Sequence, residues 1–303
     1  MGNRIVTDTT DFFSIDSGDE IHIAGKRYKV TGHARELRFG VEDPKFWVKR
    51  VWDMDTEEKK IIKLSFLESF DACLGGVKIK CFRNPDKEGN ILDLTKDNPC
   101  FMNGKAYRDL KENNVRIIDV VRGPNFLTYL GSFKMSYDIY FHTVLPGILK
   151  ELIKTFEAVS FLHQNGFRHG DIRNDHIIKD TDSGNLVWID FDYDFQAPEN
   201  PFSLDIFGLG NILLYAVGKG FHTYYMIKND TFAYHDLIGR IMPEDFSLLD
   251  ERRFVNLRKL YPLVPESLND ILMHFSRGAN VYYEAADEIT EDLKHCLKTS
   301  FAI

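Results

Sequence analysis

The sequence has few cysteines, and none of them is arranged to bind a metal. Its 303 residues include only four: Cys73, Cys81, Cys100 and Cys296. No two of them form a C-x-x-C pair or show the spacing of a zinc site. We therefore expect free thiols in a reducing cytosol, and no metal site built from sulfur.

Long apolar runs and an excess of basic residues are also missing. No run approaches the ~18 apolar residues needed to cross a bilayer, and the first residues lack the basic-then-apolar layout of a secretion signal. The formal net charge of -8 argues against a surface that binds nucleic-acid phosphates nonspecifically. The composition thus predicts a soluble, cytoplasmic protein with no nucleic-acid partner and no membrane association.

The first part of the chain has the pattern of a β-rich unit. Residues 18–65 alternate short apolar or β-branched stretches with turn-rich breaks, which predicts a small antiparallel sheet. Residues 85–98 begin with proline at a plausible first helical position and predict one short helix. Two further strand-like runs, 100–107 and 115–121, bring the prediction to five strands and one helix before residue 122.

The remainder of the chain changes to a helical period. In residues 147–166 apolar side chains recur at steps of three and four, which is typical of a buried helix. Further helical patterns cover residues 203–218, 265–275 and 283–297. No internal repeat or long linker separates the two parts. We expect them to touch and to form a cleft.

Two acidic residues flank a predicted hairpin between these helices. Asp171 lies in a polar loop and Asp190 ends the β-like run NLVWID, 19 positions later. A hairpin-like return between them would bring both carboxylates to one edge. Such a pair suits metal–phosphate chemistry, in which one carboxylate orients a hydroxyl and the other holds a divalent cation. The alternative is that both residues merely cap helices or turns.

These residues carry a resemblance to a known family. RHGDIRNDH resembles the catalytic loop H-x-D-x-x-x-x-N of the protein-kinase superfamily, and WIDFD resembles its D-F-G motif. The H-G-D spelling is also common in aminoglycoside-type phosphotransferases. The resemblance implies that Asp171 is the catalytic base and that Asp190 is the main magnesium ligand.

Other elements of the superfamily follow in the required order. KKIIKLSF resembles the V-A-I-K strand, which would make Lys63 the phosphate-binding lysine, with Glu88 in KEGNIL as its ion-pair partner. Taken singly, both would be read as solvated surface charges. The run 116–130 resembles the hinge between lobes, with Ile118 as gatekeeper and the backbone of Asp119, Val120 and Val121 facing the adenine. Asp205 would hold the backbone of the catalytic loop.

The resemblance implies an α+β, bilobal protein-kinase-like fold over residues 1–303. Its N-terminal lobe, residues 18–121, would contain a five-stranded antiparallel sheet and the αC helix. Its C-terminal lobe, residues 122–303, would be mainly helical. The implied ligands are ATP and Mg²⁺ or Mn²⁺.

Three positions depart from the superfamily pattern. His176 stands where an asparagine binds the second magnesium, and an imidazole suits manganese better than magnesium; it could equally be a packed histidine. Asp192 replaces the glycine of D-F-G and could supplement the metal shell. The nucleotide-covering loop offers only Gly32 and Gly40, so Arg35 or Arg38 would have to contact phosphates.

The acceptor of a transferred phosphate is not evident from the sequence. Only 14 residues separate Asp190 from Asp205, too few for a large peptide platform. The leading hypothesis is an atypical Ser/Thr-type protein kinase that phosphorylates an unknown protein. A small-molecule, aminoglycoside-like kinase and a non-catalytic pseudokinase that serves as a nucleotide-binding or scaffold module are the alternatives.

Overall fold

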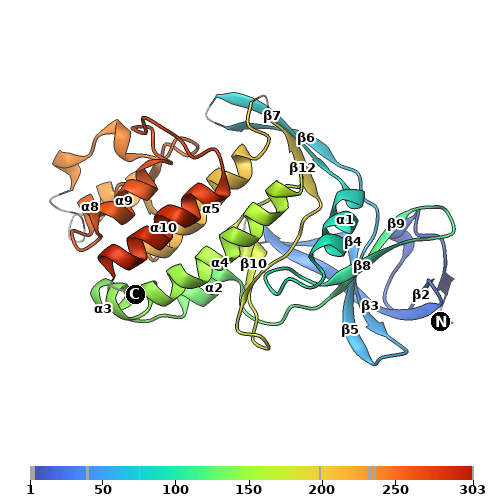
Figure 1. The fold of residues 1–303 in the computed structure, drawn as a ribbon. Helices are drawn as coiled ribbons and strands as arrows, with labels where there is room; N and C mark the ends of the chain where they lie inside the picture. Colours follow the sequence, from blue (N-terminus) through green and yellow to red (C-terminus); the bar gives the residue numbers. More distant parts are fainter. Residues whose placement is uncertain are drawn as a thin grey trace.

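The protein has an α+β fold in which most strands precede most helices (Figure 1). The computed structural model describes residues 4–301, apart from 39–40, 75, 198, 231–233 and 235–236. Figure 1 places the large sheet at one end of the molecule and the helices at the other.

The large sheet has seven strands in the order β1-β2-β3-β4-β5-β9-β8. All neighbouring pairs are antiparallel except β1 and β2, which are parallel. Its strands, in sheet order, are β1 (Ile5–Val6), β2 (Glu20–Ile23), β3 (Lys26–Arg38), β4 (Val41–Asp53), β5 (Glu58–Lys63), β9 (Asn114–Asp119) and β8 (Gly104–Arg108).

The prediction of a five-stranded antiparallel sheet was therefore wrong in the number of strands and in the direction of one strand pair. One cause lies in residues 21–30, an apolar stretch predicted as one strand. The chain reverses direction there, and Ala24 and Gly25, with φ angles of 50° and 75°, form the tight turn between β2 and β3. A two-residue turn of this kind matches the twist of the paired strands. The other cause is the short N-terminal strand β1, which no sequence pattern indicated.

A second, three-stranded sheet connects distant parts of the chain in the order β12-β7-β6. Strands β6 (Ser69–Leu74) and β7 (Val77–Arg83) form a hairpin, and β12 (Tyr193–Gln196) pairs antiparallel with β7. In the sequence, these strands are runs of six and seven residues on either side of a Gly-Gly pair, which is a hairpin signal. The predicted strands did not include this hairpin. The sheet ties the segment after Asp190 to the chain that leads into the first helix.

Opposite sides of the large sheet are covered by different segments. Apolar residues of the N-terminal segment, including Phe12 and Ile15, pack with Val30, Val51 and Ile62 of the strands. Helix α1 (Pro85–Thr95) contacts β8 and β9 and contributes Ile91 and Leu92 to the main core. The helix begins after Asn84, whose side chain accepts a hydrogen bond from the amide of Lys87.

The helical region packs around one long helix. The longest described helix, α4 (Leu145–Gln164), buries one face against α10 (Ala286–Ser300) and α5 (Ser203–Val217). The shorter helices are α2 (Phe126–Gly131), α3 (Tyr137–Thr143), α6 (Tyr224–Asn229), α8 (Leu257–Leu260) and α9 (Glu266–Met273). The helices predicted over 85–98, 147–166, 203–218, 265–275 and 283–297 are confirmed, with ends shifted by a few residues.

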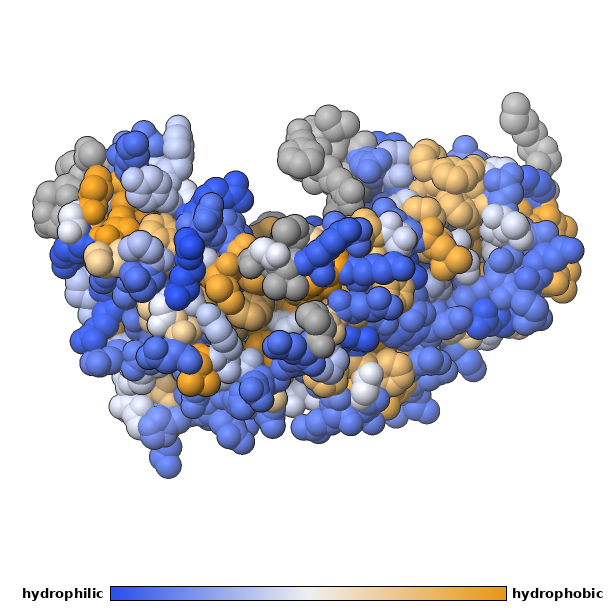
Figure 2. Space-filling view, turned by 90° about the horizontal axis from the view of Figure 1, so that it is seen from above, coloured by the Kyte–Doolittle hydropathy of each residue, from blue (hydrophilic) through white to orange (hydrophobic). Residues whose placement is uncertain are grey.

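Two short strand pairs complete the helical region. Strands β10 (Ile177–Lys179) and β11 (Leu186–Trp188) form one hairpin. The other pair, β13 (His222–Thr223) and β14 (Arg253–Phe254), is antiparallel but joins segments on either side of α6. In the described part of the chain, no helix combines the length and the apolar character needed to span a bilayer. From above, the surface is mainly hydrophilic with separate hydrophobic patches (Figure 2).

Candidate functional site

Lys63 joins two carboxylates from distant segments. It is the last residue of β5 and is 6% exposed. Its Nζ donates a hydrogen bond of 2.7 Å to Glu88 Oε1, and it also contacts Asp190 Oδ1. Glu88 lies in the first turn of α1 and is fully buried. The ion pair between Lys63 and Glu88 that the resemblance implies is thus present.

The buried charges around Lys63 compensate one another. Burial by itself would lower the pKa of Lys63, but Asp190, Asp192 and Glu88 together raise it above the ordinary lysine value. Burial would raise the pKa of Asp190, but Lys63 and His176 hold it well below the usual range. Both groups are therefore charged at neutral pH.

Glu88 is fixed by two further contacts that spacing did not reveal. The Arg116 Nε lies 2.9 Å from Glu88 Oε2, and the backbone amide of Phe191 donates to Glu88 Oε1 at 3.1 Å. Both groups are buried. Glu88 thereby links β5, β9 and the segment after Asp190. Because Lys63 also contacts Asp190, the negative charge of Glu88 is balanced by Arg116 as well as by Lys63.

Asp190 adopts a strained backbone conformation. Its φ of 71° lies in the left-handed region, which few residues other than glycine enter readily. Such a conformation costs on the order of 1–3 kcal/mol and is typical of functional sites.

The β10–β11 hairpin, with Ile177 paired to Trp188, returns the chain from the loop of Asp171 to Asp190. The hairpin-like return predicted from the sequence is confirmed.

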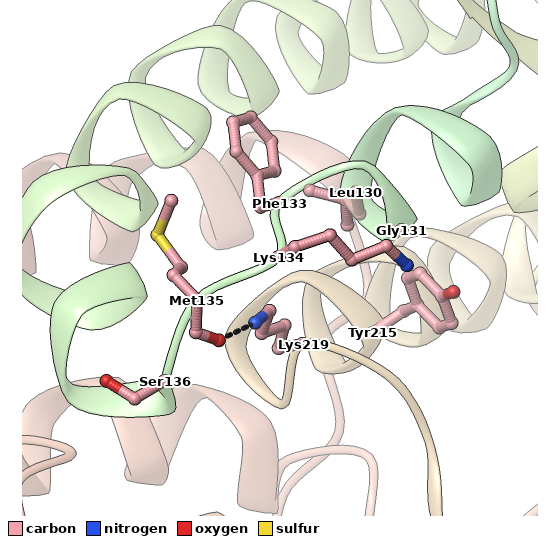
Figure 3. Close-up of a pocket in the computed structure, with 8 residues that line it drawn as sticks. All are labelled: Leu130, Gly131, Phe133, Lys134, Met135, Ser136, Tyr215 and Lys219. Carbon is pink, nitrogen blue, oxygen red and sulfur yellow. Dashed lines mark hydrogen bonds between the residues drawn. The ribbon is translucent and has the colours of Figure 1, made fainter.

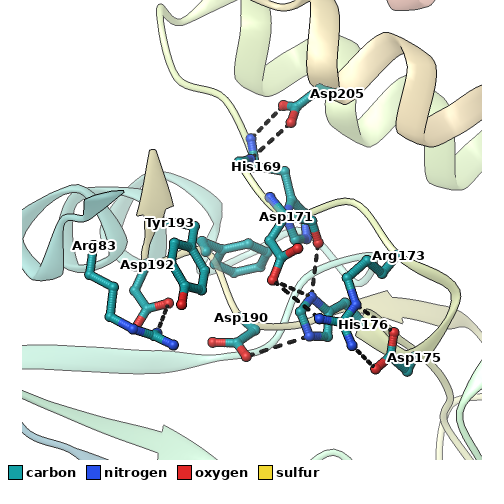
Figure 4. Close-up of polar contacts among 12 residues, drawn as sticks. Arg83, His169, Asp171, Arg173, Asp175, His176, Asp190, Asp192, Tyr193 and Asp205 are labelled. Carbon is teal, nitrogen blue, oxygen red and sulfur yellow. Dashed lines mark hydrogen bonds and ion pairs between the residues drawn. The ribbon is translucent and has the colours of Figure 1, made fainter. Parts of the chain in front are cut away.

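The loop before this hairpin is held by its backbone. Asp205, in the first turn of α5, accepts hydrogen bonds from the amides of His169 at 2.6 Å and Gly170 at 2.9 Å (Figure 4). Gly170 has a φ of 88°, and a Cβ atom there would overlap the carbonyl oxygen of Tyr193. Only glycine fits this position, which explains the middle residue of H-G-D. The contact expected of Asp205 is present.

Asp171 and Asp190 lie on either side of His176 (Figure 4). The His176 Nδ1 is 2.8 Å from the carbonyl oxygen of Asp171 and 3.5 Å from its Oδ2, and the Nε2 is 3.7 Å from Asp190 Oδ2. A carbonyl only accepts, so Nδ1 is the donor in this contact, and Nε2 is the ring nitrogen that faces Asp190. Burial raises the pKa of Asp171, against the opposing effect of His176 and Arg173.

Asp192 is paired mainly with Arg83, although its Oδ2 also lies 3.7 Å from Lys63 Nζ. It is 1% exposed, and both its carboxylate oxygens accept from Arg83 Nη1, at 2.9 and 2.8 Å. Arg83 was not among the predicted site residues because no motif marks it. Both carboxylate oxygens of Asp192 accept from Arg83, whereas at Asp190 it is Oδ1 that contacts Lys63. We therefore keep Asp190, and not Asp192, as a candidate metal ligand.

The predicted adenine contacts lie at the end of β9 and just after it. Ile118 is 4% exposed and belongs to the main core, and Val121 packs against that core. Asp119 pairs through its carboxylate with Lys60 Nζ at 2.8 Å, and its amide donates to the carbonyl of Asn103. Val120 is 37% exposed. The amide of Asp119 is thus used within the fold.

The predicted glycine loop is a pair of long strands. Gly32 lies in β3 with a φ of 149°, beside a register shift in the pairing with β4. Gly40 and the side chain of Arg38 lie outside the described residues. Arg35 lies in β3, opposite Pro44. The described geometry therefore gives no support to the prediction that Gly32 and Gly40 cover a nucleotide.

The described residues contain no group of three or more His, Cys, Asp or Glu side chains placed to hold a metal by themselves. Asp190 and His176 place one carboxylate and one imidazole nitrogen, Nε2, 3.7 Å apart. Magnesium is commonly held by one or two carboxylates together with substrate phosphates. The two residues fit a cation that takes its remaining ligands from a phosphate and water.

A cavity of ≈ 580 Å³ opens beside Asp171. Its wall includes Asp171, Arg173, Tyr193, Arg252 and Arg253. Another cavity of ≈ 580 Å³, shown in Figure 3, lies between α2 and α5 and is lined by Lys134, Tyr215 and Lys219, among others. None of its lining residues belongs to the candidate site. Of these two cavities, the first is the one that Asp171 lines.

Comparison with known proteins adds no family assignment. The chain matches no protein-family model, and no curated protein matches it.

Proposed function

We propose that this protein is an ATP-dependent phosphotransferase with a bilobal protein-kinase-like fold. In this proposal the large sheet and α1 form one lobe and residues 122–303 the other. The observation that carries it is that Lys63, Glu88, Asp171 and Asp190, which lie on four separate segments, meet through direct contacts or through His176. A fold that needs only packing has no physical reason to gather these charges.

Each residue has a distinct proposed role. Lys63 binds phosphate oxygens of ATP, and Glu88 holds its ammonium group in place. Asp171 accepts the proton of the attacking hydroxyl, and its raised pKa makes it a stronger base than an ordinary carboxylate. The stretch from Ile118 to Val121 lies along the adenine.

Asp190 and His176 are the residues that would hold a divalent cation, Mg²⁺ or Mn²⁺. When bound, such a cation neutralises the charge of the phosphates. Without one, Asp190 is neutralised by Lys63, so ATP and its cation would have to compete with that ion pair. The acceptor in this proposal is a protein hydroxyl.

A nucleotide-binding scaffold without catalysis is the second candidate. Its supporting observation is that a histidine contacts Asp171 and approaches Asp190, where the superfamily pattern has an asparagine. A third candidate, a small-molecule kinase, is favoured by the size of the cavity beside Asp171, because ≈ 580 Å³ lies within the range of small-ligand pockets.

The deciding experiment uses γ-labelled ATP with magnesium or manganese, and with the protein alone or with a generic protein acceptor. Asp190→Ala is the control, and ATP binding is followed in parallel by thermal shift. We expect label transfer that disappears in the control and falls strongly in Asp171→Ala. Metal-dependent stabilisation without transfer would favour the scaffold. Transfer that survives both substitutions would overturn the proposal.

A further inference from the structure

The cavity beside Asp171 continues into a second cavity. The second one has a volume of ≈ 600 Å³ and shares Leu204 and Leu249 with the first as lining residues. Much of its wall is apolar, with contributions from the β6–β7 hairpin, α5 and the loop before α10. The apolar and aromatic lining residues are Ile79, Phe207, Leu248, Val281, Tyr282 and Tyr283.

The first cavity carries arginines close to its carboxylates. Arg252 Nε lies 3.0 Å and Arg253 Nη2 3.4 Å from the same carboxylate, that of Asp250. Arg253 also donates to Asn211 Oδ1 at 2.7 Å and stacks over the ring of Phe221. Two guanidinium groups thus share one carboxylate, which leaves one positive charge for a ligand.

The other carboxylates of this cavity have partners of their own. Asp205 is occupied by the amides of His169 and Gly170. Asp171 Oδ2 lies 3.5 Å from His176 Nδ1 and 3.9 Å from Arg173 Nη1, and Arg173 also pairs with Asp175 through its Nε at 2.9 Å. Arg252 is the most accessible of these cations, with 81% of its side chain exposed. Burial lowers the pKa of Arg253, so its charge is poorly solvated and would gain from a nearby anion.

From this arrangement we propose that the phosphate acceptor is a polypeptide segment with an acidic side chain and a large apolar side chain flanking the acceptor hydroxyl. The hydroxyl would reach Asp171, the acidic group would meet Arg252 and Arg253, and the apolar side chain would enter the second cavity. This inference rests on the proposed function, since it names the substrate of the same site.

The size and chemistry of the two cavities favour a polypeptide over a compact small molecule. Each cavity alone has the volume of a small-ligand pocket, so a small acceptor at Asp171 would leave the apolar one empty. Val281 is 65% and Tyr282 38% exposed there, and contiguous exposed apolar side chains commonly mark interaction sites. An extended chain fills both cavities because its side chains can enter each in turn.

The transfer itself balances without an additional reactant. The acceptor oxygen forms a bond to the γ-phosphorus, and the bond between that phosphorus and the oxygen bridging to the β-phosphate breaks. The hydroxyl proton passes to Asp171, and ADP leaves with the bonding electron pair. The products are a phosphorylated peptide and ADP.

The test combines peptide selection with direct binding. A positional-scanning peptide library around one fixed serine is screened in two ways, by labelling with γ-labelled ATP and by direct binding to the protein without nucleotide. The preferred peptide of either screen is then made fluorescent for anisotropy measurements. We expect enrichment of Asp or Glu at one position and of Leu or Phe at another. Replacing the acidic residue by lysine, or the apolar residue by alanine, should weaken binding about tenfold.

Two exposed positions of the protein are altered in parallel. Arg252→Glu and Val281→Lys should each weaken binding of the preferred peptide about tenfold, and both side chains are exposed enough to leave folding intact. The matched controls are Arg258→Glu and Ile238→Lys, which are also exposed and line neither cavity. The controls should bind the peptide like the unaltered protein.

The outcomes separate this inference from the proposed function. Asp190-dependent transfer to small alcohols or sugars but not to any peptide would overturn the inference and keep the phosphotransferase. Equal peptide binding by all four variants and the unaltered protein would also overturn it. Peptide binding with the expected pattern, but no Asp190-dependent transfer to any acceptor, would support the docking surface while the proposed function fails.

Discussion

Arg83 and Asp192 form a buried ion pair in which the Arg83 Nη1 lies 2.9 and 2.8 Å from the two carboxylate oxygens. The guanidinium also lies 4.0 Å from the ring centroid of Tyr193, and its Nε is 3.1 Å from Glu68. Asp192 follows Asp190 by two residues, so this pair fastens the strained segment to the end of β7. Lys87 adds a second attachment through the carbonyls of His169 and Tyr193.

Removing one partner of this pair should destabilise the protein strongly. Arg83→Met leaves the Asp192 carboxylate buried without its main cation, and we expect the free energy of unfolding to fall by about 3–5 kcal/mol. Urea denaturation measures it. The double variant Arg83→Met/Asp192→Leu should recover part of the loss, because it buries no unpaired charge there. Additive losses in the two single variants and their combination would contradict a direct coupling.

Lys63 should be required for ATP binding. Lys63→Met removes the cation proposed to meet the phosphates, and it leaves Glu88 with Arg116 as its remaining cationic contact. We expect the thermal shift caused by ATP and metal to disappear while the circular dichroism of the folded protein is kept. Lys59→Met is the matched control, since Lys59 is an exposed lysine of the same strand. A full ATP-induced shift in Lys63→Met would remove this residue from the site.

The metal preference should follow the imidazole of His176. Its Nε2 lies 3.7 Å from Asp190 Oδ2, and imidazole suits manganese better than magnesium. We predict that manganese supports turnover at least as well as magnesium. In His176→Asn the balance should move toward magnesium, because an amide oxygen is a harder ligand. A clear magnesium preference in the unaltered protein would count against His176 as a ligand.

The buried ring of His169 should make the protein sensitive to acid. Burial lowers the pKa of His169 to about 3, from an ordinary value of 6.5. Between these pH values the unfolded chain binds a proton that the folded protein does not, so the free energy of unfolding falls as the pH falls. The slope from this group is about 1.4 kcal/mol per pH unit.

The measurement is urea unfolding of the unaltered protein and of His169→Phe between about pH 4.5 and 7.5, a range that covers the upper part of that window and the flat region above it. Phenylalanine keeps the edge contacts with Trp188 and Phe191 but does not titrate. We expect the variant to lose this part of the pH slope, while His142→Phe, at an exposed position, keeps it. An unchanged slope in His169→Phe would show that other groups cause the acid sensitivity.

The local sequence pattern was sufficient to predict the helices and to single out the principal charged residues. The recurrence of apolar residues at helical steps placed α4, α5, α9 and α10, because one buried stripe is a property of a single segment. The motifs singled out Lys63, Glu88, Asp171 and Asp190, and all four lie in one contact network. Sheet order was less accessible, since β1 and the β12–β7 pairing join segments far apart in the chain.

The sequence by itself determined which charges exist and which segments carry them, but only the tertiary structure decided which of those charges are neutralised. Asp192 looked like a metal ligand because it stands two residues after Asp190, yet it is held by Arg83, 109 positions away in the sequence. From the sequence, Gly170 looked like a neutral variation of the loop motif, but the carbonyl oxygen of Tyr193 lies where its Cβ would be. Ion pairing and close backbone approach depend on distances in space, and a one-dimensional pattern contains no such distances.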